Sequence, residues 1–165
     1  MQKAKFWLPL PRYFMATGRI SRLQYLVHSV ILFAIFIVFS LTAVNLGQTL
    51  DAARGHVIGA TVSTLVTSYL YFCLDAKRAH DLSWPAVIVV IMLGEPVVFA
   101  SMNLVFSFAE FHPQGLVGSM LIVNRFWRYA AGIIGLILLF IPGKHGKNKY
   151  GSDPLQAPSP PIDVF

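Results

Sequence analysis

Charged side chains are scarce in this sequence. Asp, Glu, Lys and Arg make up only 12% of its 165 residues, whereas 56% of the residues are hydrophobic. A typical soluble domain carries roughly 25% charged residues and buries only about 70% of the surface that its unfolded chain exposes. A soluble fold of this size cannot hide so much apolar surface. The composition argues against a water-soluble enzyme or a disordered chain, and it indicates an integral membrane protein with one domain.

Residues that bind metals and nucleotides are also few or badly spaced. The single cysteine, Cys73, excludes an intrachain disulfide and a cysteine-based metal site. The five histidines show no spacing typical of a metal site. Gly146 and Lys147 are followed by Asn148, so the phosphate-loop pattern is absent. We therefore expect no metal, no cofactor and no nucleic-acid partner.

Four apolar runs are present, and they lack the alternation of a membrane β-barrel. The first run, as a helix that rises 1.5 Å per residue, matches a hydrocarbon core of about 30 Å. We predict an all-α integral membrane four-helix bundle with a kinked third span and both termini in the cytoplasm. The expected spans are about 26–46, 57–74, 84–106 and 126–141. Residues 1–25 form a cytoplasmic or interfacial segment, and residues 142–165 a cytoplasmic Gly/Lys motif with a Pro-rich tail.

Two of these spans require a choice between alternatives. Pro96 interrupts the third run and predicts a kink. A re-entrant hairpin is the alternative, but each arm would be too short to cross a membrane. In the fourth run, Arg125 and Arg128 would each cost about 2.5–3.5 kcal/mol near the bilayer centre. We therefore start the fourth span near Phe126 and expect residues 115–123 to lie on the outer surface or to dip into it.

Lys and Arg are distributed unevenly along the chain. Ten of them precede the first run, lie between the second and third runs, or follow the fourth, whereas three lie in the other connections. Cytoplasmic loops carry an excess of positive charge. This distribution predicts that both termini are in the cytoplasm, in a bacterial inner membrane, with anionic phospholipid as the neighbouring ligand.

Three polar motifs adjoin the expected cytoplasmic ends of the spans, and together they resemble the DUF805 family of small bacterial inner-membrane proteins. The matching residues are Gly18, Arg19, Arg22 and Tyr25; Arg78, His80, Asp81 and Trp84; and Gly146, Asn148, Tyr150, Gly151 and Pro154. The resemblance implies an architecture and a location but no reaction, because the family is one of unknown function. The chain departs from the family in having Lys77 before Arg78, a short Leu82-Ser83 connection and a longer segment between the third and fourth spans.

The motif residues have a functional and a structural interpretation. As a candidate site for lipid or a partner we take Arg19, Arg22, Tyr25, Lys77, Arg78, His80, Asp81, Trp84, Asn148 and Tyr150. In this interpretation the cations bind a phosphate group. In the structural one, Asp81 caps the third span or pairs with Arg78 or Arg22, and Ser21 or Thr17 caps the first span.

Glu95 is the most unusual residue inside a span, because an acidic group there is costly and normally faces protein or water. It is a candidate intramembrane polar site together with His28 and Asn103. Glu95 either takes part in a proton or cation step or forms a structural hydrogen bond to His28, to Asn103 or to a hydroxyl of the second span.

Three functions remain open from the sequence. The first is a non-enzymatic accessory, scaffold or regulatory membrane protein that contacts anionic lipid, a protein partner or a second copy of itself. The alternative is a small proton- or solute-coupled transporter or channel that uses Glu95. A lipid-modifying enzyme that uses His80 and Asp81 is the third, and we expect that the protein is not an enzyme.

Overall fold

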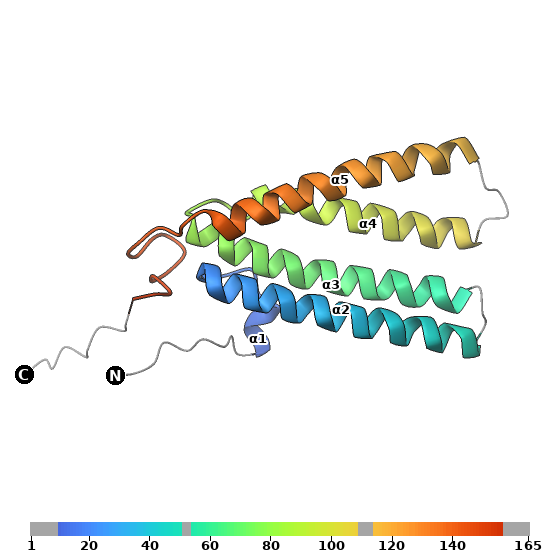
Figure 1. Cartoon of the computed structure of the whole chain (residues 1–165), viewed down its shortest axis with the longest axis horizontal. Helices are drawn as coiled ribbons and strands as arrows, with labels where there is room; N and C mark the ends of the chain where they lie inside the picture. The colour runs from blue at the N-terminus through green and yellow to red at the C-terminus, as the bar shows by residue number, and fades with distance from the viewer. Residues whose placement is uncertain (1–9, 51–53, 109–113, 157–165) are drawn as a thin grey trace, which may run out of the picture.

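The computed structural model describes residues 10–50, 54–108 and 114–156, and this part of the chain is helical (Figure 1). It contains no strand, and its only β-type pairing is an isolated bridge between Asn148 and Gly151. The predicted all-α class is therefore confirmed. The helices are α1 (Leu10–Tyr13), α2 (Arg22–Leu50), α3 (Arg54–Asp81), α4 (Val87–Phe108) and α5 (Gln114–Phe140).

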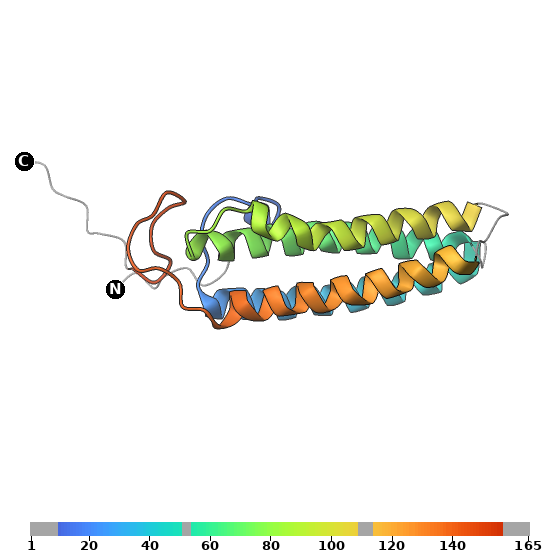
Figure 2. The same cartoon turned by 90° about the horizontal axis from the view of Figure 1, so that it is seen from above.

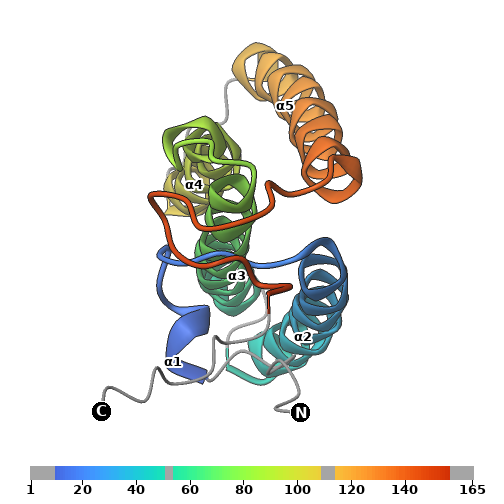
Figure 3. The same cartoon turned by 90° about the vertical axis from the view of Figure 1, so that its left-hand side faces the viewer.

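The four long helices lie lengthwise beside one another, and consecutive helices run in opposite directions (Figures 1 and 2). Viewed from one end, α3 lies in the middle and is in contact with α1, α2, α4 and α5 (Figure 3). Residues 14–21, 82–86 and 141–156 all lie at the same end of the bundle, which we call the motif end. The three polar motifs, far apart in the sequence, therefore meet at one end.

Two helices contain stretches that are long and apolar enough to cross a membrane, namely Arg22–Thr42 and Val57–Asp81. A shorter apolar stretch covers Val87–Met102. Large apolar side chains are exposed along all four long helices, which a soluble fold would bury. They include Leu23, Val30, Phe33, Val38, Val62, Val66, Ile91, Val98, Ile133, Leu136 and Phe140. These features indicate association with a membrane.

Capping explains where α2 begins. The hydroxyl of Ser21 accepts a hydrogen bond from the backbone amide of Gln24 (3.3 Å), and the Gln24 side chain accepts one from the Ser21 amide (2.9 Å). This reciprocal pair is a capping box, which satisfies amides that have no partner in the first turn of a helix. The prediction that Ser21 caps the first long helix is confirmed.

Two expected boundaries differ from the structure, and one alternative for the third span is excluded. Helix α5 begins at Gln114, so residues 115–123 continue the same helix instead of forming a separate surface segment. Nothing in the sequence around Arg125 breaks a helix, since Arg is a good helix former. Helix α3 extends to Asp81, so the second motif lies on its last turns and not in a loop. Helix α4 continues through Pro96, so the hairpin alternative is wrong, while the kink stays a prediction.

Candidate functional site

The candidate site is built on the carboxyl end of α3. Ser83 has a φ of 63° there, and its amide bonds to the carbonyl of His80 (3.0 Å). The amide of Trp84 bonds to the carbonyl of Ala79 (2.8 Å). These two bonds form a Schellman motif, in which a residue in the left-handed conformation closes the helix. The sharp turn leaves the side chains of the last turn of α3 directed into the motif end.

Arg78 is completely buried at the centre of this end. Its guanidinium donates to the carbonyl of Leu138 through Nε (2.7 Å) and to the carbonyl of Ile141. The last carbonyls of a helix have no partner within that helix, so Arg78 caps the carboxyl end of α5. It also lies 3.5 Å from the carbonyl of Ile20, and it donates to Asp81. One side chain of α3 thus holds the ends of two other segments.

Asp81 is shared by two arginines. Its Oδ1 accepts from Nε and Nη2 of Arg19, at 3.1 and 3.0 Å, and its Oδ2 accepts from Nη1 of Arg78. The Arg19 side chain is only 1% exposed. We call Arg19, Arg78 and Asp81 the arginine–aspartate cluster. The predicted pairing of Asp81 with Arg78 is confirmed, whereas the second partner is Arg19 and not Arg22.

The rest of the Arg19 guanidinium binds the segment that follows α5. Its Nη1 donates to the carbonyls of Gly146 (2.6 Å) and Gly151 (3.3 Å), and its Nη2 donates to the carbonyl of Lys144. The Lys144 amide in turn donates to the carbonyl of Asp81 (2.9 Å). All three motifs are therefore joined through the arginine–aspartate cluster.

Two glycines are required by this arrangement. A Cβ on Gly143 would lie 1.8 Å from Oδ2 of Asp81, so any larger residue would displace the carboxylate. Gly146 has a φ of +80°, in the region that side chains disfavour. A glycine at each position lets the backbone turn closely around the cluster.

The third motif also packs on the imidazole of His80. The ring of Tyr150 stacks on that of His80, with centroids 3.8 Å apart and an interplanar angle of 12°. Nδ1 of His80 lies 3.2 Å from the carbonyl of Gly18. Asn148 donates to the carbonyl of His80 (2.8 Å) and to the hydroxyl of Ser83 (3.1 Å). His80 therefore contributes contacts between motifs, and Asn148 closes the turn after α3.

Lys77 is buried on the other face of the last turns of α3, where it is 1% exposed. Its ammonium donates to the carbonyls of Met15 and Cys73, the latter at 3.1 Å. It thus attaches the segment after α1 to α3 and is not presented to the surface. Trp84, the last residue of the second motif, packs against the apolar core at this end.

A second buried polar pair lies just inside the bundle. The hydroxyl of Tyr25 on α2 donates to Oδ1 of Asp75 on α3 (2.8 Å), and Asp75 is 3% exposed. Sequence reasoning selected Tyr25 but missed Asp75. The available signal was an acidic residue within the apolar stretch Val57–Asp81, the same signal that had drawn attention to Glu95.

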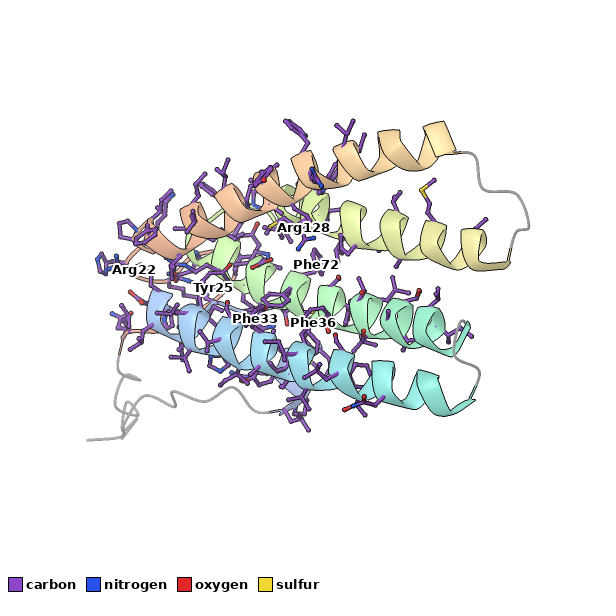
Figure 4. All side chains as sticks on the ribbon, turned by 45° about the vertical axis from the view of Figure 1, so that its right-hand side comes forward. Arg22, Tyr25, Phe33, Phe36, Phe72 and Arg128 are labelled. Carbon is purple, nitrogen blue, oxygen red and sulfur yellow. The ribbon has the colours of Figure 1, made fainter. Side chains whose placement is uncertain are left out.

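Two of the remaining candidates, Arg22 and His28, lie outside the arginine–aspartate cluster. Arg22 is exposed at the first turn of α2 (Figure 4). His28 is buried on α2, with its ring centroid 5.3 Å from that of Tyr13. The side chains of Glu95 and Asn103 lie outside the described residues, so the proposed intramembrane group stays a prediction.

The charges at the motif end fall into two sets. The arginine–aspartate cluster and Lys77 are buried and bonded within the protein. A second set of cations is exposed at the same end, and we call it the basic rim: Arg12, Arg22, Lys144, Lys147 and Lys149. Asp153 accepts backbone hydrogen bonds from Leu155 and Gly146, which lower the pKa of its carboxyl below the usual value.

The residues that were candidates for catalysis are engaged in contacts within the protein. In the described part of the chain, no three His, Cys, Asp or Glu residues lie close enough to hold a metal ion. His80 is stacked and Asp81 is shared by two guanidinium groups, so the pair proposed for an enzyme is engaged in structural contacts. The basic rim is the part of the motif end that is free to meet an anion.

The family described as protein of unknown function (DUF805) matches residues 13–152. This range includes the whole arginine–aspartate cluster and most of the third motif. No curated protein and no solved structure matches the chain.

Proposed function

Because the chain belongs to the DUF805 family, which has no assigned activity, we propose from its geometry that it is a non-enzymatic accessory or scaffold protein of the bacterial inner membrane. In this proposal α2, α3, α4 and α5 each cross the membrane. The motif end faces the cytoplasm, and the basic rim contacts anionic phospholipid or an acidic partner.

One observation carries the proposal: the cations of the basic rim and the exposed apolar side chains occupy different parts of the same bundle. The basic rim lies at the motif end, whereas exposed apolar side chains extend along the helices. A helix of about 20 residues matches the hydrocarbon thickness, and lysines and arginines gather on the cytoplasmic side. An even number of crossings accounts for the position of residues 14–21 and 141–156 at the same end.

The topology is tested by labelling single cysteines in a Cys73→Ser background. We expect a membrane-impermeant maleimide to label Thr17→Cys and Lys147→Cys in inverted vesicles but not in intact spheroplasts. Arg54→Cys, at the start of α3 and the opposite end of the bundle, serves as the matched control with the reverse result. Labelling of positions 17 and 147 from opposite sides would overturn the four-span proposal.

The lipid contact is tested with the basic rim. Each cation near an anionic membrane surface contributes about 1 kcal/mol, so replacing Lys144, Lys147 and Lys149 by Gln is expected to lower binding of phosphatidylglycerol more than tenfold. Native mass spectrometry of the protein in mild detergent measures the bound lipid. The matched control replaces the same three lysines by Arg and keeps the charge. Equal lipid retention in the two triple variants would contradict the proposal.

A further inference from the structure

A partly open cavity of about 490 Å³ lies among the long helices, with walls from α2, α3, α4 and α5. Its volume falls within the range of about 300–1,000 Å³ that is typical of ligand sites. Phe33, Phe36 and Phe72 form an aromatic part of the wall, and Thr67 and Ser68 add hydroxyl groups (Figure 4). The lining is therefore suited to a molecule that is partly apolar and partly polar.

Asp75 supplies a negative group to this wall. The residue is 3% exposed, and the hydroxyl of Tyr25 at Oδ1 is its only hydrogen-bond partner in residues 10–50, 54–108 and 114–156. A carboxylate has about four positions at which it can accept a hydrogen bond, and a buried one is costly to leave short of partners. Asp75 thus retains capacity for a donor inside the cavity.

Arg128, an exposed residue of α5, supplies a positive group at the open part of the cavity. Figure 4 shows this side chain extending from α5 toward the other helices. Its guanidinium has five N–H donors, yet no hydrogen bond or ion pair joins it to any other residue that the structure describes. The adjoining Trp127 holds α5 against α4. Its Nε1 donates to the carbonyl of Ile91 (2.9 Å), and its ring packs so closely on Gly94 that a Cβ there would lie 3.1 Å from it.

The two charged groups lie at different depths. A Cβ on Gly135 of α5 would lie 3.9 Å from the hydroxyl that bonds Asp75, so Asp75 and Gly135 are level. Arg128 precedes Gly135 by two helical turns, which is about 10 Å farther from the motif end. A bound cation would pair with Asp75 and leave Arg128 without a partner. A bound anion would pair with Arg128 and leave Asp75 with Tyr25 alone.

We infer that this cavity binds a molecule in which a primary amine and an oxyanion are joined by a short linker, with the amine on Asp75, the oxyanion on Arg128 and the apolar part against the three phenylalanines. Two sources share this chemistry: the headgroup of phosphatidylethanolamine and a soluble zwitterion such as phosphoethanolamine. The lipid source rests on the proposed membrane location. Its amine would then face the motif end, as it does in a cytoplasmic leaflet.

The test uses the full-length protein in mild detergent and compares Arg128→Gln with Arg125→Gln. Both arginines are exposed, and the control removes the same charge one turn away from a residue that is not part of the cavity wall. We expect native mass spectrometry to show that the wild type retains phosphatidylethanolamine over phosphatidylcholine, whose quaternary ammonium has no N–H. Arg128→Gln is expected to lower this retention at least tenfold, and Arg128→Lys to restore part of it. Asp75→Asn is expected to abolish the preference for the primary amine.

A second arm measures phosphoethanolamine binding by titration calorimetry. Saturable binding that Arg128→Gln lowers tenfold identifies a soluble zwitterion as the occupant. If Arg128→Gln and Arg125→Gln match the wild type in both arms, the inference is wrong. That outcome is independent of the cysteine labelling, which tests the membrane topology alone, so the two failures are distinguishable.

Discussion

The motif end and the middle of the bundle hold their charged side chains in different ways. At the motif end, Asp81 bonds to both Arg19 and Arg78, and each guanidinium also donates to backbone carbonyls. In the middle, Asp75 and Arg128 line the same cavity, and Tyr25 alone bonds to the carboxylate within the described residues. At the motif end the charged groups satisfy one another and nearby carbonyls. In the middle of the bundle, Asp75 and Arg128 can still form hydrogen bonds to another molecule.

The difference follows from where helices end. The last four carbonyls of a helix have no partner in that helix, and turns add further free carbonyls. Arg78 and Arg19 use such groups, including those of Leu138 and Gly146. Halfway along a helix most carbonyls already accept the amide four residues later, so they are less available than those at a helix end. A charged side chain there relies more on other side chains or on a ligand.

The largest expected loss of stability comes from a substitution at Asp81, in the centre of the motif end. Asp81→Asn removes the charge that two buried guanidinium groups share, and removal of one partner from a buried ion pair costs about 3–5 kcal/mol. We expect a much lower unfolding temperature. The buried thiol of Cys73 provides the measurement, because a thiol-reactive dye reports its exposure during heating.

Lys147→Gln is the control for this prediction, since it removes an exposed charge at the same end. Exposed charges contribute about 0–1 kcal/mol, so its unfolding temperature is expected to remain near that of the wild type. Equal unfolding temperatures for Asp81→Asn and the wild type would mean that the cluster does not stabilise the fold.

Gly143→Ala breaks the same region by crowding. The added methyl would lie 1.8 Å from the Asp81 carboxylate, and forcing atoms into a packed site costs about 1–3 kcal/mol. Gly132→Ala is the matched control in α5, where no atom lies within 4 Å of the new Cβ. The control is expected to gain about 0.5–1 kcal/mol, because Ala favours a helix interior. If the unfolding temperature falls in Gly143→Ala and rises in Gly132→Ala, the result supports the close approach of Gly143 to Asp81. If it changes in the same direction in both variants, the result argues against that approach.

Tyr25→Phe tests the hydrogen bond to Asp75 at the edge of the cavity. It removes the hydroxyl that bonds Asp75, and the lost hydrogen bond to a buried carboxyl group costs about 2 kcal/mol. Tyr129→Phe is the control, because that ring is 73% exposed. In an Asp75→Asn background the cost of Tyr25→Phe is expected to differ from its cost in the wild type, since the two residues interact directly. Strictly additive changes in unfolding free energy would contradict the contact.

The sequence was sufficient for the fold class and for the residues of the motif end. Apolar runs predicted four helices in the right order, and the uneven distribution of Lys and Arg placed the three motifs at the same ends of the predicted spans. The partner of Asp81 was harder to predict. Arg19 and Arg22 are equally basic, and only the turn before the Ser21 cap, which starts α2 at Arg22, directs Arg19 inward and leaves Arg22 exposed.

The cavity could not be predicted from the pattern of residues. Asp75 and Arg128 are separated by a long stretch of chain, and their shared wall depends on how α3, α4 and α5 are offset. Arg78 bonds α3 to the carboxyl end of α5, and Trp127 bonds α5 to α4. The expectation that Arg128 marks the end of a span treated it as facing lipid headgroups. The helix itself continues past Arg128 to Gln114, and the start of the fourth span stays a prediction.

The smallest expected effect is a loss of stability at low pH. It tests whether the exposed turn that contains Asp153 supports the buried cluster. Asp153 accepts the amides of Gly146 and Leu155, each at 2.9 Å, and the carbonyl of Gly146 receives Arg19. These bonds lower the pKa of Asp153, so its stabilising contribution is present above the unfolded value of about 3.9 and is lost as the pH falls through the lower folded pKa. Thermal unfolding is followed by circular dichroism from pH 7 to pH 3. Asp153 is expected to contribute nothing to the pH dependence of the unfolding temperature until the pH falls to about 4. Asp153→Asn removes this component, so the stability difference between wild type and variant narrows in acid. A difference that stays constant to pH 3 would mean that the carboxylate does not hold the turn on which Arg19 depends.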